Sequence, residues 1–180
     1  MTPLPAPPLR LRGMAPGDLP GFAAIEARAV RGEADGAPLS LGDLTPFLLR
    51  HEVFVAEGET GAPLGFAAAA PLSSFEKDAD GEGAEGCFWI GALRVDPSAE
   101  ADGVARALLG RVTERANWFF CRALAAAVSR DSAFGAPFFR RNGFLLVDPA
   151  DWTPALRKRF DAQCPPGVPP EGRCLVVHWL

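Results

Sequence analysis

The chain has 180 residues, of which 48% are hydrophobic, and it carries a formal net charge of -4 at pH 7. A chain of this length is most simply one domain that buries roughly two-thirds of its unfolded surface. The charge argues against a nucleic-acid partner, which needs a basic excess or a clustered basic patch. No apolar run approaches the ~20 residues of a membrane span, and prolines interrupt the N-terminus where a signal peptide needs an apolar helix. We therefore expect a cytoplasmic protein with no membrane partner.

The cysteines favour neither a metal site nor a disulfide framework. Cys87, Cys121, Cys164 and Cys174 show no C-x-x-C spacing and no nearby histidine pair. We expect reduced thiols and no bound metal.

The N-terminal residues divide into a lead and the start of a domain. Residues 1–8 contain four prolines and are predicted to form a flexible lead, followed by a single domain over 9–180. Leu9 to Arg12 alternate like a first strand. Asp18 then stands at the N-cap position of a helix. The apolar face of that helix carries Leu19, Phe22 and Ile25.

A second helix and a hairpin are predicted next. Thr45 has the character of an N-cap and Pro46 that of a first helical residue, so a short helix is expected through Leu49. Val53 to Ala56 and Leu64 to Ala70 are strand-like runs. The residues between them are turn formers, which indicates a hairpin.

The segment from Phe88 to Phe119 predicts a strand, a tight turn and a helix. Phe88 to Val95 is an apolar strand, and the helix from about Gly103 to Phe119 keeps an apolar stripe at Val104, Leu108 and Val112. Gly103 lets the backbone approach a ligand, and the first free N–H groups of the helix lie at its positive dipole end. Because open α/β sheets bind ligands at the carboxyl ends of their strands, this turn predicts a phosphate site.

The last third of the chain contains an unusually long connection. Strands are predicted at Leu124 to Val128, at Phe144 to Val147 and at Leu175 to Leu180, with a helix that begins near Ser132. Residues 148–174 are long for a connection between the last two strands, so they are interpreted as an insertion.

The insertion itself predicts a helix. Thr153 and Pro154 signal a helix start, and Leu156 and Phe160 lie four apart on one face. We expect a helix of about two to three turns there.

Three motifs carry a resemblance to a known family. They are V-D-P at Val95 to Pro97, E-x-x-G-x-A at Glu100 to Ala105, and F-F-R-R-N-G-F at Phe138 to Phe144. In order and spacing they resemble the GNAT superfamily of acyl-CoA-dependent N-acyltransferases, over about Leu9 to Leu180. The resemblance implies an α/β domain with a mixed, mostly antiparallel sheet flanked by helices, and acetyl-CoA as co-substrate.

The resemblance also implies where the cofactor binds. The pantetheine arm would pair like an extra strand against Leu93, Arg94 and Val95. Backbone amides of the following turn would hold the pyrophosphate. That turn consists of Ala101, Asp102, Gly103, Val104, Ala105 and Arg106. Ser132 stands where the family often has an asparagine that contacts pantetheine, and a helix N-cap is its alternative role.

Several positions depart from the family pattern. Glu100 occupies a place that usually holds Gln or Arg, which predicts weaker affinity for the phosphates. Phe139 occupies the place of a tyrosine that protonates the departing thiolate in many members, and the chain contains no tyrosine. Water or Ser132 would then protonate the sulfur, or the thiolate leaves unprotonated. Ser132 is accordingly the candidate catalytic residue.

The general base stays unassigned. Trp89 and Gly91 fill strand positions where relatives often carry glutamate. The remaining candidates are His51, His178, Glu82, Glu85 and Asp131. A histidine in a terminal strand is more often packed than catalytic, although its ordinary pKa suits proton uptake.

The predicted function is transfer of an acetyl group from acetyl-CoA to a primary amine of a small molecule or peptide, within a ternary complex. The alternative is a catalytically silent acyl-CoA-binding or sensor module, and a protein-modifying enzyme is a third hypothesis. The acidic loop at Glu76, Asp78, Asp80, Glu82 and Glu85 is either a solvated loop or an attractant for a cationic amine. The insertion 148–174 is interpreted as a lid over the acceptor site, or else as a contact in a homodimer.

Overall fold

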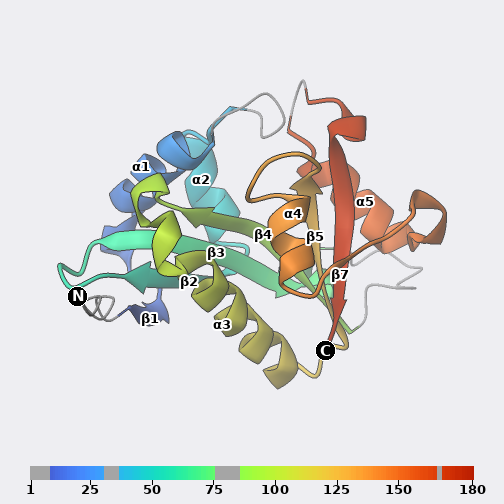
Figure 1. The fold of residues 1–180 in the computed structure, drawn as a ribbon, viewed down its shortest axis with the longest axis horizontal. Helices are drawn as coiled ribbons and strands as arrows, with labels where there is room; N and C mark the ends of the chain where they lie inside the picture. The colour runs from blue at the N-terminus through green and yellow to red at the C-terminus, as the bar shows by residue number, and fades with distance from the viewer. Residues whose placement is uncertain (1–8, 31–36, 76–85, 166–167) are drawn as a thin grey trace, which may run out of the picture.

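The computed structural model describes residues 9–30, 37–75, 86–165 and 168–180, with the backbone alone at 100–102. Within these residues, seven strands form one sheet in the order β1-β2-β3-β4-β5-β7-β6 (Figure 1). Strands β4 and β5 run parallel, and the other neighbouring pairs are antiparallel. The expected mixed, mostly antiparallel sheet in a single α/β domain is therefore confirmed.

The N-terminal half supplies three strands and two helices. Their bounds are β1 (Arg10–Gly13), α1 (Leu19–Ala29), α2 (Leu41–Leu48), β2 (Glu52–Glu57) and β3 (Pro63–Pro71). The C-terminal half supplies the rest of the sheet and three further helices. They are β4 (Cys87–Val95), α3 (Val104–Trp118), β5 (Ala123–Ser129), α4 (Ala136–Arg141), β6 (Leu145–Leu146), α5 (Pro154–Gln163) and β7 (Arg173–Trp179). No helix of the described residues is long and apolar enough to cross a membrane.

The predicted start of the second helix at Thr45 is wrong. Helix α2 begins at Leu41, and Ser40 is its N-cap, with its Oγ accepting a hydrogen bond from the Asp43 amide at 3.2 Å. Pro46 therefore lies inside the helix, where it removes one backbone donor. Burial of Leu44 and Leu48 on one face of the helix offsets this loss.

The N-cap residues of two further helices agree only in part with the prediction. Asp18 occupies the predicted N-cap position of α1, but its side chain makes no cap bond to that helix. Its carboxylate instead accepts from the guanidinium of Arg12, at 2.7 and 2.8 Å, and from the Ala15 amide at 2.7 Å. Helix α4 begins at Ala136 with Gly135 as its N-cap, so Ser132 does not cap it. The proline at position 137 suits the first turn of a helix, which explains the later start.

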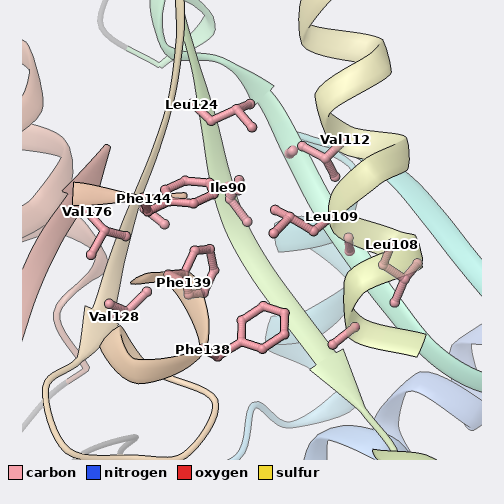
Figure 2. Packing of buried hydrophobic residues seen from close by; sticks show 14 of the residues in the cluster. Ile90, Leu108, Leu109, Val112, Leu124, Val128, Phe138, Phe139, Phe144 and Val176 are labelled. Carbon is pink, nitrogen blue, oxygen red and sulfur yellow. The ribbon is translucent and has the colours of Figure 1, made fainter. Parts of the chain in front are cut away.

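The helices cover both faces of the sheet. Helices α3 and α4 pack on one face, and Figure 2 shows their side chains on either side of Ile90. The labelled residues of these two groups are Leu108, Leu109 and Val112 of α3, and Phe138, Phe139 and the nearby Phe144. Helices α1 and α2 pack on the opposite face, and α5 covers the same face beside β5 and β7.

The predicted helix in the long connection is confirmed as α5. Thr153 caps it, with its Oγ1 accepting from the Leu156 amide at 3.3 Å. Phe160 is buried and its ring centroid lies 4.5 Å from that of Trp152. Because Phe160 belongs to the hydrophobic core over β5 and β7, α5 is an integral layer of the domain.

Candidate functional site

Strands β4 and β5 separate halfway along their length. Their parallel register extends from Cys87↔Ala123 to Ile90↔Ala126. In the described residues both strands continue beyond this point without pairing to each other. On its other edge β4 stays paired with β3, where Ala69 lies opposite Ile90 and Ala68 opposite Ala92, so Gly91 is an extra residue. Such a bulge bends a strand, and here it accompanies the divergence of β4 from β5.

A cavity of about 750 Å³ occupies the space between the diverging strands. Its walls include Ile90 to Val95 of β4 and Ala126 to Ser129 of β5, together with residues of α1, α2, α4 and α5. A volume of this size suits a ligand as large as a drug or a cofactor arm. The unpaired backbone of β4 is available to an extended ligand, since the strand has lost its β5 neighbour there.

The predicted phosphate turn lies between β4 and α3. Pro97–Asp102 form a 3-10 turn, and Gly103 follows with φ 72°, a left-handed conformation that favours glycine. The Ala107 amide makes the first bond of α3, to the Gly103 carbonyl at 3.0 Å. The backbone amides of Val104, Ala105 and Arg106 therefore come before the first hydrogen bond of the helix, and they lie at the positive end of α3.

Helix α1 braces this turn through two ion pairs that the sequence did not reveal. Arg28 donates to Asp96 at 2.5 Å, and Arg94 donates to Glu26 at 2.8 Å. The pKa of Asp96 is lowered, first by the hydroxyl of Ser98 and also by Arg28. Glu26 is buried and lines the cavity. Its only signal in the sequence is a carboxylate on the apolar face of a helix, next to Ile25.

The structure brings most of the predicted cofactor residues to this region. Leu93, Arg94 and Val95 lie on the unpaired stretch of β4 and line the cavity. The turn from Ala101 to Arg106 lies where β4 passes into α3, although the side chains of Ala101, Asp102 and Glu100 are outside the described residues.

The opposite wall of the cavity carries hydroxyl groups rather than a phenol. Ser132 lines it, and so does Ser129, a buried residue that sequence reasoning missed. The Ser129 Oγ accepts from the Ser132 amide at 3.3 Å, which holds the two serines together. Phe139 also lines the cavity, and it offers only an apolar ring at the place where the resemblance implied a tyrosine.

His51 is the candidate base that the structure brings to the cavity. Its ring lies between Phe47 and Phe75, with centroid distances of 4.4 and 5.0 Å. Its Nδ1 lies 2.8 Å from the Phe47 carbonyl, and a carbonyl only accepts, so Nδ1 carries the proton. Its Nε2 is buried with no hydrogen-bond partner in the described residues. A Cβ added at Gly91 would overlap the ring, so Nε2 lies directly against the bulge.

The environment of His51 keeps it neutral. Its pKa is lowered to about 4, chiefly by burial and also by the charges of Arg159 and Arg50, while the bond to the Phe47 carbonyl acts in the opposite direction. At neutral pH the Nε2 atom therefore presents a lone pair and no charge.

The other candidate bases lie elsewhere. His178 bonds the Gly143 carbonyl at 2.9 Å and does not line the cavity, and Asp131 is exposed. Glu82 and Glu85, like the rest of the acidic loop, fall outside the described residues. Of the candidates in the described part of the chain, His51 is thus the one beside the bulge.

Helix α5 also contacts the bulge, through the side chain of Gln163. Gln163 accepts from the Trp89 Nε1 at 2.5 Å and donates to the Gly91 carbonyl at 2.6 Å. These bonds explain why Trp89, a buried strand residue, has a satisfied indole. Gln163 also lines the cavity, so α5 forms part of its wall.

The described residues hold no group of three His, Cys, Asp or Glu side chains that would bind a metal ion. All four cysteines are free thiols, and burial raises the pKa of Cys87 to about 12.

Comparisons with known proteins agree with this arrangement. The model of the acetyltransferase (GNAT) family matches residues 26–144. No curated protein sequence matches the chain.

Solved structures resemble it in fold. The ribosomal-protein-S18-alanine N-acetyltransferase of Escherichia coli is 16% identical with a TM-score of 0.64, over 95% of this chain and 93% of that chain. The ribosomal-protein-alanine N-acetyltransferase of Brucella melitensis is 20% identical with a TM-score of 0.67, over 95% of this chain and 99% of that chain. N-acetylglutamate synthase of Neisseria gonorrhoeae, solved with coenzyme A and N-acetyl-glutamate, is 18% identical with a TM-score of 0.66, over 96% of this chain and 35% of that chain.

Proposed function

Because this chain belongs to the GNAT acetyltransferase family, we propose that it transfers an acetyl group from acetyl-CoA to a primary amine of a small molecule or peptide. The observation that carries the proposal is the cavity where β4 leaves β5, adjacent to the free amides at the start of α3. One end of this space suits an extended thioester arm and its phosphates, and the other end is open to a second substrate.

The cofactor arm lies along β4 in this proposal. Its amide groups pair with the backbone of Leu93, Arg94 and Val95, which lacks a β5 partner. The pyrophosphate binds the amides of the turn from Ala101 to Arg106, where backbone donors and the helix dipole favour an anion. The coenzyme A complex of the Neisseria enzyme supports a cofactor of this class for the fold.

The reaction needs no covalent enzyme intermediate. The amine nitrogen attacks the thioester carbonyl, the C–N bond forms, the C–S bond breaks, and the nitrogen loses one proton to solvent water. The sulfur leaves as a thiolate, which an ordinary thiol pKa of about 8.5 allows, or it takes a proton from Ser132 or water. A single cavity that reaches β4, α2 and α5 supports direct transfer in a ternary complex.

A second candidate function is an acyl-CoA-binding module without transfer. It is favoured by the absence of tyrosine from the chain and by the apolar ring of Phe139 in the cavity wall. In that case acetyl-CoA binds, and no amine accelerates the release of its thiol.

Titration calorimetry with acetyl-CoA, followed by a thiol-release screen over amines, tests both functions. Gly103→Glu adds bulk and negative charge to the phosphate turn and forces a side chain into a left-handed backbone, so we expect binding to be lost. Gly110→Glu is the matched control, because Gly110 is an exposed residue further along α3 with open space around it. Unchanged affinity in Gly103→Glu would remove the basis of the proposed cofactor site.

A further inference from the structure

In the proposed function, on which this inference rests, the reacting thioester lies beside Gly91. The phosphates bind the turn after β4, and the pantetheine arm runs back along Leu93 to Val95. The next residues in that direction are Ala92 and Gly91. The backbone at Gly91 therefore borders the carbonyl carbon that the acceptor amine must reach.

Gly91 is the residue of β4 that the sheet does not hold. The register with β3 passes from Ile90 to Ala92, and the register with β5 ends at Ile90. Within the part of the chain that the structure describes, Gly91 thus has no partner in either neighbouring strand, whereas each other residue of β4 has at least one. Glycine also has more backbone freedom than any other residue. Contacts from outside the strands are therefore needed to fix this peptide group.

Gln163, the last residue of α5, supplies a hydrogen bond to Gly91 from outside the sheet. Its Nε2 donates to the Gly91 carbonyl at 2.6 Å, and its Oε1 accepts from the Trp89 indole at 2.5 Å. An indole N–H only donates and a carbonyl only accepts, so these partners determine which end of the Gln163 amide faces which group. Trp89 is fully buried in the core that α5 covers, so the amide has a rigid anchor.

The His51 ring also contacts Gly91, but it cannot orient the carbonyl. A Cβ added at Gly91 would overlap the ring, so the ring restricts the space around this residue. The ring proton is on Nδ1, which faces the Phe47 carbonyl, and Nε2 can therefore only accept. The bond from Gln163 is thus the contact that sets the direction of the Gly91 carbonyl.

We propose that Gln163 is a positioning residue for acetyl transfer, which acts through the Gly91 backbone by fixing the peptide group against which the thioester lies. The cofactor arm and the phosphates, which bind away from Gly91, contribute most of the affinity for acetyl-CoA. A misplacement of about 1 Å at the reacting groups can lower a rate about 100-fold. Loss of the Gln163 bond should therefore change kcat far more than KM for acetyl-CoA.

Two substitutions remove this bond, and a control leaves it in place. Gln163→Leu removes both hydrogen bonds of the side chain. Gln163→Glu keeps an oxygen for the Trp89 indole and, as a carboxylate at pH 8, offers no donor to the Gly91 carbonyl. Phe160→Leu is the matched control, because it weakens the packing of α5 in the same core while Phe160 lies outside the cavity.

Two measurements compare these variants with the wild type, well below their melting temperatures. Steady-state thiol release with an acceptor amine gives kcat and KM. Acetyl-CoA labelled with carbon-13 at the carbonyl gives an NMR signal of the bound thioester, which needs no turnover. We expect both Gln163 variants to lower kcat about tenfold or more, to change KM for acetyl-CoA less than about threefold, and to shift the carbonyl signal. Phe160→Leu should keep the wild-type kcat and signal.

The outcomes separate this inference from the proposed function. A wild-type kcat and a wild-type carbonyl signal in both Gln163 variants overturn the positioning role and leave the acetyltransferase intact. Equal losses in Phe160→Leu also overturn it, since a loosened α5 would then explain them. A shifted signal in the Gln163 variants, without turnover by any of the proteins, supports the positioning of the thioester and contradicts the proposed transfer. Absence of acetyl-CoA binding by the wild type overturns both.

Discussion

Protonation of His51 should destabilise the folded protein. The ring is stacked between two phenylalanines, its Nε2 is buried against Gly91, and its pKa is lowered from 6.5 to about 4. The unfolded chain therefore binds more protons than the folded protein between these two pH values. Because of this difference, stability rises with pH across the window from about 4 to 6.5.

The size of the effect follows from the same values. The difference between a pKa of 6.5 and one of about 4 corresponds to about 3 kcal/mol of unfolding free energy. The contribution is fully present above pH 6.5, falls as the pH drops, and is lost at about pH 4. Asp18 and Asp96, whose pKa values are lowered in the folded state, add acid sensitivity at lower pH.

Denaturant unfolding at a series of pH values measures the contribution of His51 to the unfolding free energy, with His51→Gln as the reference protein. The carboxylates are common to both proteins, so the difference between the two isolates His51. The chain has two histidines, and proton NMR of their rings therefore gives two signals, which His178→Gln assigns. We expect the His51 signal to stay constant down to about pH 5.

Two results would refute the reasoning. If the unfolding free energies of wild type and His51→Gln change with pH in the same way, the fold does not hold the His51 ring neutral. Titration of the His51 signal near its ordinary pKa would show that water reaches Nε2, so the contact with Gly91 would be wrong.

Three substitutions test the surroundings of the cavity. Gly91→Ala should lower the unfolding free energy by about 1–3 kcal/mol, because its Cβ overlaps the His51 ring, and an unchanged denaturation midpoint would mean that the ring has room to move. Ser132→Ala should leave the melting temperature unchanged, since Ser132 caps no helix, and it should raise KM for acetyl-CoA. A normal KM would exclude the proposed contact between Ser132 and pantetheine. Gln163→Leu should lower the unfolding free energy by about 2 kcal/mol, because it leaves the Trp89 indole and the Gly91 carbonyl without hydrogen-bond partners. An unchanged unfolding free energy would mean that these groups find other partners.

Local signals in the sequence predicted most of the elements. Thr153 caps α5 as expected, because a hydroxyl followed by proline acts within one turn of chain. The same logic failed at α2, where Thr45 and Pro46 carry the same signal and yet lie inside the helix. Ser40 is a second residue of a type that caps helices, and a helix that begins after Ser40 buries Leu44. Local sequence therefore indicates the possible N-cap residues, and packing in the tertiary structure determines which of them is used.

The candidate site was only partly predictable for a related reason. Gly103 was found because its turn connects neighbouring elements and needs a backbone conformation that favours glycine. Glu26 and Ser129 were missed, since their positions depend on which strands and helices become neighbours. His51 was one of several candidate bases, and its proximity to Gly91 was not visible in the spacing.

The sequence by itself determined the alternation of the strands and the turn that precedes α3, because side-chain periodicity and turn chemistry act over a few residues. The fold class was predicted from the family resemblance that the three sequence motifs carry. Only the tertiary structure decided that β4 leaves β5 at Ile90 and that Gly91 bulges between His51 and Gln163. Contacts such as that between Trp89 and Gln163, 74 positions apart, exist only after the sheet order brings β4 and α5 together. Sheet order minimises the exposed apolar surface of the whole domain, and no short stretch of sequence contains that information.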